Sequence, residues 1–187
     1  MNKQLIKLAE TTLLLLEKKS WHSIKIDEVY NKININKKNL QNKIDNKRDL
    51  LLNINRYFDF KLHNVTDSID QSTRKDMLFE IMMMRFDILQ IHRKAIIKIF
   101  EFFKKKPQEL VFLLPSLIES MISMAGLAKI PVAGIKGNLK VKGLLVIYFS
   151  TFLVWVKDNS ESLEKTMTSL DNHLDRAGKL ISVIKIT

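Results

Sequence analysis

Residues 36–43 carry a dense set of side chains that can contact a nucleic acid. The segment reads Asn-Lys-Lys-Asn-Leu-Gln-Asn-Lys. The amides of Gln41 and Asn42 can form paired hydrogen bonds with adenine, and a lysine such as Lys37 or Lys38 can reach guanine or a phosphate. The alternative interpretation is that these are solvated positions of a short polar helix, and the residues alone leave both open.

Catalytic and metal-binding chemistry has little support in the rest of the sequence. The four histidines, His22, His63, His92 and His173, lie far apart, with no HExxH spacing, no glycine-rich phosphate loop and no GxSxG motif. The chain has no cysteine, which excludes disulfides, thiolate zinc sites and cysteine nucleophiles. We expect a protein that is not an enzyme and that uses no metal and no cofactor.

The composition predicts an all-α protein. Hydrophobic residues make up 46% of the 187 residues, and there are only 3 prolines and 5 glycines. Apolar residues recur at helical spacing along most of the chain. The start lacks the pattern of a secretory signal, and the uncharged run 143–156 is short for a membrane span, so we expect a cytoplasmic location.

The chain is strongly basic, with a formal net charge of +11 and a pI near 9.7. Up to Leu62 there are 13 Lys and Arg against 7 Asp and Glu. Such a surface attracts polyanions, either nucleic acid or anionic lipid. A generally lysine-rich proteome would give the same balance, so charge alone does not choose among these interpretations.

The first third of the chain has the pattern of a helix-turn-helix. Apolar spacing predicts helices over about 5–18 and 26–33 and a third from near residue 36. Asn46, followed by Asp49 three residues later, is typical of a helix N-terminus and predicts a long fourth helix that joins this head to the rest. In a helix-turn-helix the second helix of the motif enters the major groove.

The remainder predicts a larger helical body. We expect helices near 77–88, 96–106 and 107–126, with a kink at Pro115, and then a loop over 126–138. Two further helices complete the chain. These helices carry two apolar seams spaced by three and four residues: Val141, Leu145, Tyr148, Phe152 and Trp155, and then Leu163, Met167, Leu170, Leu174, Ala177, Ile181 and Ile184.

A helix that is apolar on nearly every side needs more than one partner. Pairing of the last two helices across a two-fold axis would supply it, which predicts a homodimer. The alternative is a helix buried inside the monomer. The predicted dimer interface comprises Tyr148, Phe152, Trp155, Leu163, Met167, Leu170 and Leu174.

The head resembles the N-terminal domain of TetR-type bacterial transcriptional regulators. The positions that carry the resemblance are Trp21, Ile26, Val29, Ile35, Leu40, Ile44, Lys47, Asp49, Leu50 and Leu51. The resemblance implies a recognition helix over 36–43 and a phosphate contact from Lys47. The implied DNA-contacting residues are Lys25, Asn36, Lys37, Lys38, Gln41, Asn42 and Lys47.

The head departs from the TetR pattern at several positions. This chain has Lys25, Tyr30, Asn34, Lys38, Gln41 and Ile44 where the family usually has Thr, Ala, Gly, Gly, Tyr and Phe. Glycine supplies a positive φ in the turn, and asparagine tolerates that conformation better than most residues. Tyr30 is harder to fit between two closely packed helices, and Gln41 replaces a tyrosine that often contacts phosphate in the family.

A second resemblance lies in the body. It is similar to the lipid-binding accessory protein of ubiquinone biosynthesis, which has a TetR-like fold and is not a regulator. The residues on which this resemblance rests are Met83-Met84-Arg85-Phe86-Asp87 with His92-Arg93, and Asp158-Asn159-Ser160 with Thr166 and Leu170-Asp171. This resemblance implies an isoprenoid or other lipid in an apolar cavity, together with a membrane or an enzyme partner.

Both resemblances imply a hydrophobic pocket, because methionine adapts to irregular apolar ligands. Plain core is the alternative for each residue. The candidate lining comprises Met82, Met83, Phe86, Phe112, Met121 and Met124.

We therefore predict a DNA-binding head over 1–49, a ligand-binding and dimerisation body over 50–187, and a helix from about 47 that bridges them. The predicted function is a homodimeric regulator of double-stranded DNA controlled by a hydrophobic small molecule or lipid, and the alternative is the lipid-binding protein without DNA.

Overall fold

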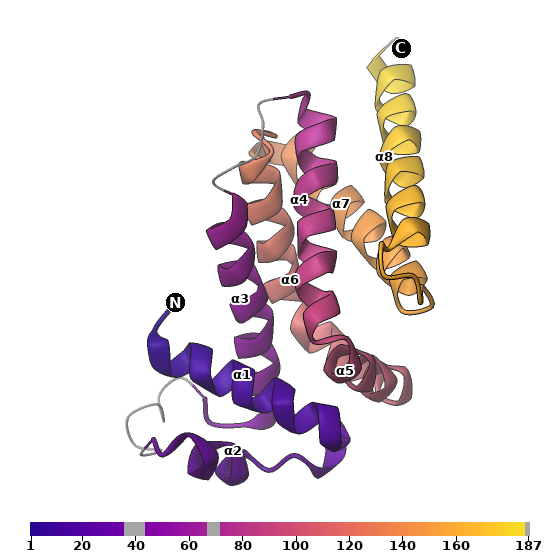
Figure 1. Cartoon of the computed structure of the whole chain (residues 1–187). Coiled ribbons are helices and arrows are strands. Elements are labelled where there is room, and N and C mark those ends of the chain that lie inside the picture. Colours follow the sequence, from indigo (N-terminus) through magenta and orange to yellow (C-terminus); the bar gives the residue numbers. More distant parts are fainter. Residues whose placement is uncertain (36–43, 67–71, 186–187) are drawn as a thin grey trace. The chain divides into compact units, whose positions relative to one another are not determined.

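The computed structural model describes residues 1–35, 44–66 and 72–185 (Figure 1). Within these ranges every regular element is helical, as the composition predicted. The elements are α1 Lys3–Lys18, the 3-10 turn η1 Trp21–Ser23, α2 Ile26–Ile33, α3 Lys47–Val65, α4 Arg74–Ile91, α5 Arg93–Lys105, α6 Pro107–Leu127, α7 Gly134–Trp155 and α8 Glu164–Lys185.

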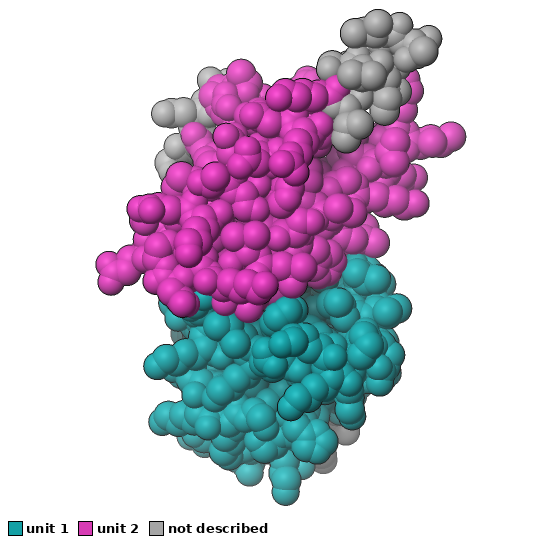
Figure 2. Space-filling model, turned by 90° about the vertical axis from the view of Figure 1, so that its right-hand side faces the viewer, with its two compact units in different colours: residues 1–65, 87–117 teal, residues 66–86, 118–187 magenta. Residues whose placement is uncertain are grey.

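The chain forms two compact units, coloured separately in Figure 2. Unit 1 comprises residues 1–65 and 87–117, and unit 2 comprises residues 66–86 and 118–187. The sequence predicted one boundary, after residue 49, between two continuous domains. The two compact units are not continuous, because α5 and the start of α6 belong with the first three helices. The reason is that α1 packs against α5 as well as against α2 and α3.

Unit 1 is built around the leucine-rich face of α1. The helix begins at the Asn2 cap, whose side-chain oxygen accepts a hydrogen bond from the backbone of Gln4 at 2.9 Å. Leu8, Leu13 and Leu16 are fully buried. Burial of each such side chain stabilises the fold by about 1.5–3 kcal/mol, which holds α1 at the centre of this unit.

The start of α3 is fixed by a reciprocal cap. The side-chain oxygen of Asn46 accepts hydrogen bonds from the backbone N–H groups of Arg48 at 2.8 Å and Asp49 at 3.1 Å. The Asp49 carboxylate accepts one in return from the N–H of Asn46 at 3.1 Å. The cap predicted from Asn46 and Asp49 is therefore confirmed, and it satisfies donors that a helix start leaves open.

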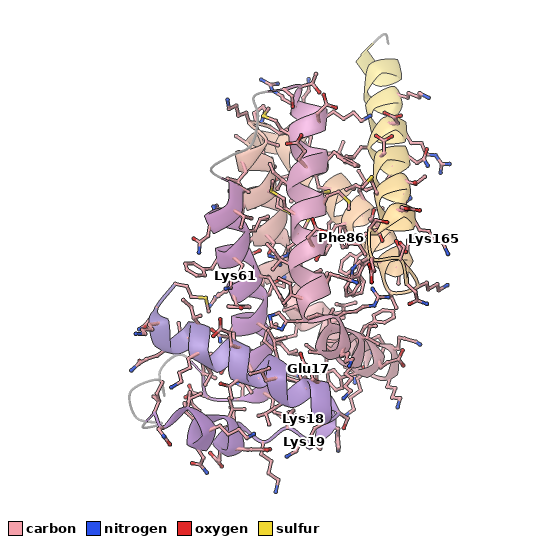
Figure 3. The ribbon with its side chains drawn as sticks, in the orientation of Figure 1. Glu17, Lys18, Lys19, Lys61, Phe86 and Lys165 are labelled. Atoms are coloured by element: carbon pink, nitrogen blue, oxygen red, sulfur yellow. The ribbon has the colours of Figure 1, made fainter. Side chains whose placement is uncertain are left out.

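Unit 2 has an aromatic core formed by side chains of α4 and α7, and α7 also packs against α8. The ring of Phe86, on α4 (Figure 3), stacks on Tyr148 with centroids 5.5 Å apart and lies 6.5 Å from Trp155. All three side chains are buried. Because Tyr148 and Trp155 are two turns apart on α7, one phenylalanine joins α4 to a long stretch of that helix.

The loop predicted over 126–138 is shorter in the structure. Helix α6 continues to Leu127 and α7 begins at Gly134, so only six residues connect them. Gly137 lies inside α7, where a Cβ would overlap the backbone of Val132. This glycine therefore permits a close approach of loop to helix and is not a loop residue itself.

Among the residues that the structure describes, two helices, α6 and α7, are long and apolar enough to cross a membrane by length and composition. Of the most apolar window of each helix, 39% in α6 and 33% in α7 is buried within the fold.

Candidate nucleic-acid interface

Tyr30 is buried in the head and connects two of its segments by a hydrogen bond. The side chain is buried, and its hydroxyl donates a hydrogen bond to the carbonyl oxygen of Ile44 at 2.9 Å. Burial, and then the carboxylates of Asp45 and Asp49, raise the pKa of Tyr30, so the phenol stays a neutral donor. The bulky residue that was hard to fit from sequence thus ties α2 to the chain that enters α3.

The turn after α2 has the conformation that glycine usually provides. Asn34 follows the last helical residue with φ 51° and ψ 37°, in the left-handed region. Its backbone N–H donates to the carbonyl of Asn31 at 3.4 Å. The expectation that asparagine tolerates this turn is confirmed.

Substitution of Asn34 should separate backbone strain from side-chain effects. We expect Asn34→Gly to keep or slightly raise the free energy of unfolding, and Asn34→Ala to lower it by about 1 kcal/mol, because alanine is strained in the left-handed region. Urea unfolding of the two variants checks this. Equal midpoints for the alanine and glycine variants would mean that the turn is not strained.

The Lys47 ammonium is hydrogen-bonded to backbone carbonyl groups of the same chain. Its ammonium donates to the carbonyl oxygens of Trp21 at 2.7 Å and His22 at 3.1 Å, and lies 5.1 Å from the centroid of the Trp21 ring. Burial, and then the nearby charge of Lys106, lower the pKa of Lys47. The lysine thus fastens the start of α3 to η1, and the phosphate contact implied by the resemblance stays a prediction.

The other predicted DNA-contacting residues divide into two groups. Lys25 is exposed and stands at the N-cap of α2, where it makes no side-chain capping bond. A threonine at this position could accept such a bond. Asn36, Lys37, Lys38, Gln41 and Asn42 lie outside the described residues.

The positive charge belongs almost entirely to unit 1, which contains α1, α2 and the residues of the predicted helix-turn-helix. Unit 1 has 19 Lys and Arg against 10 Asp and Glu, a net charge of +9, whereas unit 2 has 12 against 10, a net charge of +2. When the sequence is instead divided after Leu62, the two parts have nearly equal net charges of +6 and +5. The difference arises because the basic helix α5 packs with the head.

The predicted pocket residues fall in both units. Met82, Met83, Phe86, Met121 and Met124 are buried in unit 2, on α4 and α6. Phe112 belongs to unit 1 and is 46% exposed, with the Arg48 guanidinium 4.7 Å from its ring centroid. The structure therefore groups five of the six.

Most of the predicted dimer residues pack within the chain. Tyr148, Trp155, Leu163, Leu170 and Leu174 are buried in unit 2, where α7 contacts α8. Phe152 is half-buried, and Met167 is exposed.

A second apolar seam on α7 faces outward and was not singled out from the sequence. We call it the outer seam: Ile135, Leu139, Lys142, Val146, Phe149 and Leu153. Its members are apolar except for Lys142, and they are exposed except for Phe149, which is half-buried. Its members step by four, three, four, three and four residues, and Ile135 is 89% exposed. The near-absence of a polar face on this helix was the signal that could have revealed it.

Asp158 organises the connection between α7 and α8. Its carboxylate is buried and accepts hydrogen bonds from the backbone and hydroxyl of Ser160 at 3.1 and 2.6 Å and of Thr166 at 2.9 and 2.8 Å. Burial opposes ionisation, but these four hydrogen bonds outweigh it and hold the pKa of Asp158 well below its usual range. Asp158, Ser160 and Thr166, three of the positions that carried the second resemblance, thus have a structural role.

No group of three His, Asp or Glu side chains that could hold a metal ion occurs among the residues that the structure describes.

Comparisons with known proteins identify the fold. A TetR transcriptional regulator from Nitrosomonas europaea ATCC 19718 has a similar structure, with a TM-score of 0.74 and 16% identity over 95% of this chain and 99% of that chain. A TetR-family transcriptional regulator from Streptomyces coelicolor has a TM-score of 0.56 and 15% identity, over 89% of this chain and 79% of that chain.

Sequence comparisons give a more local result. The COQ9 family model matches residues 141–181, which span most of α7 and of α8, and this is the family to which the second resemblance pointed. No curated protein is detectably similar in sequence. Taken together, the described helices and the solved structures show that this chain has the TetR regulator fold.

Proposed function

We propose that the protein is a TetR-like transcriptional regulator that binds double-stranded DNA. The observation that carries the proposal is the net charge of +9 on unit 1, which contains the residues of the predicted helix-turn-helix. Two hydrogen bonds, from Tyr30 to Ile44 and from Lys47 to Trp21, support it, because they fix α2 and η1 to the residues that begin α3. A basic surface on a folded scaffold is what binding to the phosphates of DNA requires.

Sequence would be read by residues 36–43 in the major groove, with Lys25 at a flanking phosphate. Lys47 would reach another phosphate through its third N–H, since the other two are bound to the carbonyl oxygens of Trp21 and His22. In a homodimer two such helices face half-sites separated by one helical turn of DNA, ~34 Å, or a little more. We further propose that a hydrophobic molecule bound among the methionines of unit 2 controls binding, by favouring one of two spacings of the heads. Such a regulator would act in the bacterial cytoplasm.

Selection from a genomic DNA library at two salt concentrations tests DNA binding. We expect a discrete, roughly palindromic site for the wild type, bound more weakly at high salt. Lys37→Ala/Gln41→Ala should lose that site, because each base contact contributes about 1–3 kcal/mol. The matched control is Lys136→Ala/Asn138→Ala, which removes an exposed lysine and an exposed amide from unit 2. Sequence-blind binding, unchanged by the first pair, would contradict the proposal.

The homodimer would form through the outer seam of α7 together with Met167 of α8. We expect the wild type to sediment as a dimer at micromolar concentration and Val146→Asp/Leu153→Asp to sediment as a monomer, because a dimer would bury both new carboxylates. The control Leu14→Asp/Ile91→Asp alters two exposed apolar residues of unit 1 and should leave the dimer intact. A monomeric wild type would refute the interface and weaken the operator proposal.

A second candidate is a lipid-binding protein that does not bind DNA. The match of the COQ9 model to residues 141–181 favours it. So does the composition between Glu119 and Asp158, where the sequence has five lysines and no carboxylate. If the library selects no site, mass spectrometry of lipids that co-purify with the protein is the deciding measurement.

A further inference from the structure

Three consecutive lysines lie at the junction of α5 and α6. Lys104 and Lys105 end α5, Lys106 follows as its cap, and Pro107 begins α6. All three side chains are exposed. Lys104 is paired with Glu101 at 3.1 Å, one turn earlier on the same helix.

Contacts on both sides of this run fix it beside the start of α3. Before the run, the ring of Phe102 lies 6.1 Å from that of Trp21, and the Trp21 carbonyl accepts the hydrogen bond from Lys47. After the run, Glu109 accepts two hydrogen bonds from the Arg48 guanidinium, at 2.8 and 2.9 Å. Since Lys47 and Arg48 are the first two residues of α3, the lysine run cannot move far from the helix start that follows residues 36–43.

The fold accounts for part of this charge but not for all of it. A basic residue in the last turn of α5 suits the negative end of the helix dipole, and Lys104 has Glu101 as a partner. The carboxylate after the run, Glu109, is hydrogen-bonded to Arg48 and also attracts Lys106, so it offsets part of the charge of that lysine. Lys106 lies close enough to Lys47 to disfavour its charged form, and a bound phosphate would relieve that repulsion.

We propose that Lys104, Lys105 and Lys106 form a contact for the phosphate backbone of duplex DNA, outside the helix-turn-helix. The proposal rests on the DNA-binding function proposed above and extends its footprint to the α5–α6 junction. Lysines act on phosphates as point charges and carry no base preference. The run therefore adds affinity that depends on salt and is the same for every sequence.

The test compares Lys104→Gln/Lys105→Gln/Lys106→Gln with a control of equal charge change, Lys136→Gln/Lys157→Gln/Lys165→Gln, whose lysines are exposed on unit 2 and lie outside the outer seam. Fluorescence anisotropy measures binding to a duplex with the selected site and to an unrelated duplex, between about 50 and about 200 mM salt. We expect the slope of log affinity against log salt to fall in magnitude by about 2–3 in the junction variant, on both duplexes. The control should keep the wild-type slope.

The outcomes separate this proposal from the function on which it rests. A wild-type slope in the junction variant, or an equal loss in the control, overturns the phosphate contact and leaves the regulator proposal standing. Failure of the wild type to bind either duplex refutes both. If the triple variant does not fold, Lys105→Gln/Lys106→Gln keeps the Lys104–Glu101 pair and should still lower the slope by about 1–2.

Discussion

Replacement of Phe86 by alanine is expected to lower the free energy of unfolding by about 3–5 kcal/mol. The side chain is fully buried, and its ring stacks on Tyr148 and lies 6.5 Å from Trp155. Alanine would remove the transfer free energy of the ring, the two aromatic contacts and the packing around them, and it would leave a cavity. A typical domain has only about 5–15 kcal/mol of stability, so this variant should approach the unfolding threshold.

Urea unfolding followed by circular dichroism measures the loss. Phe112→Ala is the matched control, because it removes the same ring where it is 46% exposed and contacts the Arg48 guanidinium. That variant should lose about 1 kcal/mol or less. If the two variants have the same midpoint, Phe86 does not join α4 to α7 in the way described.

The second large effect is expected at Asp158. Asn has one acceptor oxygen and an amide that would face donors, so Asp158→Asn cannot satisfy the four N–H and O–H groups from Ser160 and Thr166. Hydrogen bonds to a charged group contribute about 1.5–3 kcal/mol, and a buried donor left without a partner is costly. We expect Asp158→Asn to lose about 3 kcal/mol at neutral pH.

This loss should depend on pH with a definite sign. The folded protein holds the pKa of Asp158 below that of an unfolded aspartate, so its contribution is present above the unfolded value and is lost as the pH falls. The difference between wild type and variant should therefore shrink below about pH 4. Asp171→Asn is the control, since Asp171 forms only an exposed ion pair with Lys75 at 3.0 Å, and exposed pairs of this kind contribute little to stability. A difference that is constant from neutral to acid pH would contradict this account.

Features that depend on a few neighbouring residues were predictable from the sequence. The cap of α3 involves Asn46, Arg48 and Asp49, and the left-handed turn depends on Asn34 alone. The boundaries of α1 and α2 follow from apolar spacing and agree with the expected 5–18 and 26–33 within two residues. In each case the physical cause lies within one or two turns of chain.

Features that depend on distant residues were not predictable. The carbonyl that accepts from Tyr30 belongs to Ile44, 14 residues away, and those that accept from Lys47 are 25 and 26 residues away. Two apolar seams of α7 could each be buried. The packing of α4 and α8 against one face decides that Tyr148 and Trp155 are buried while Val146 and Leu153 stay exposed. Likewise, chain order does not show that α5 brings its lysines to the head.

The two tryptophans of the sequence give each half of the molecule an optical probe of its own. Trp21 is buried in unit 1, with the Lys47 ammonium near its ring, and Trp155 is buried in unit 2 against Phe86 and Phe152. Indole emission responds to nearby charge and to water. Trp21→Phe leaves a chain whose fluorescence reports on the methionine-rich unit, and Trp155→Phe leaves one that reports on the basic unit. Events at a ligand site and at a DNA surface could then be timed separately, without any attached dye.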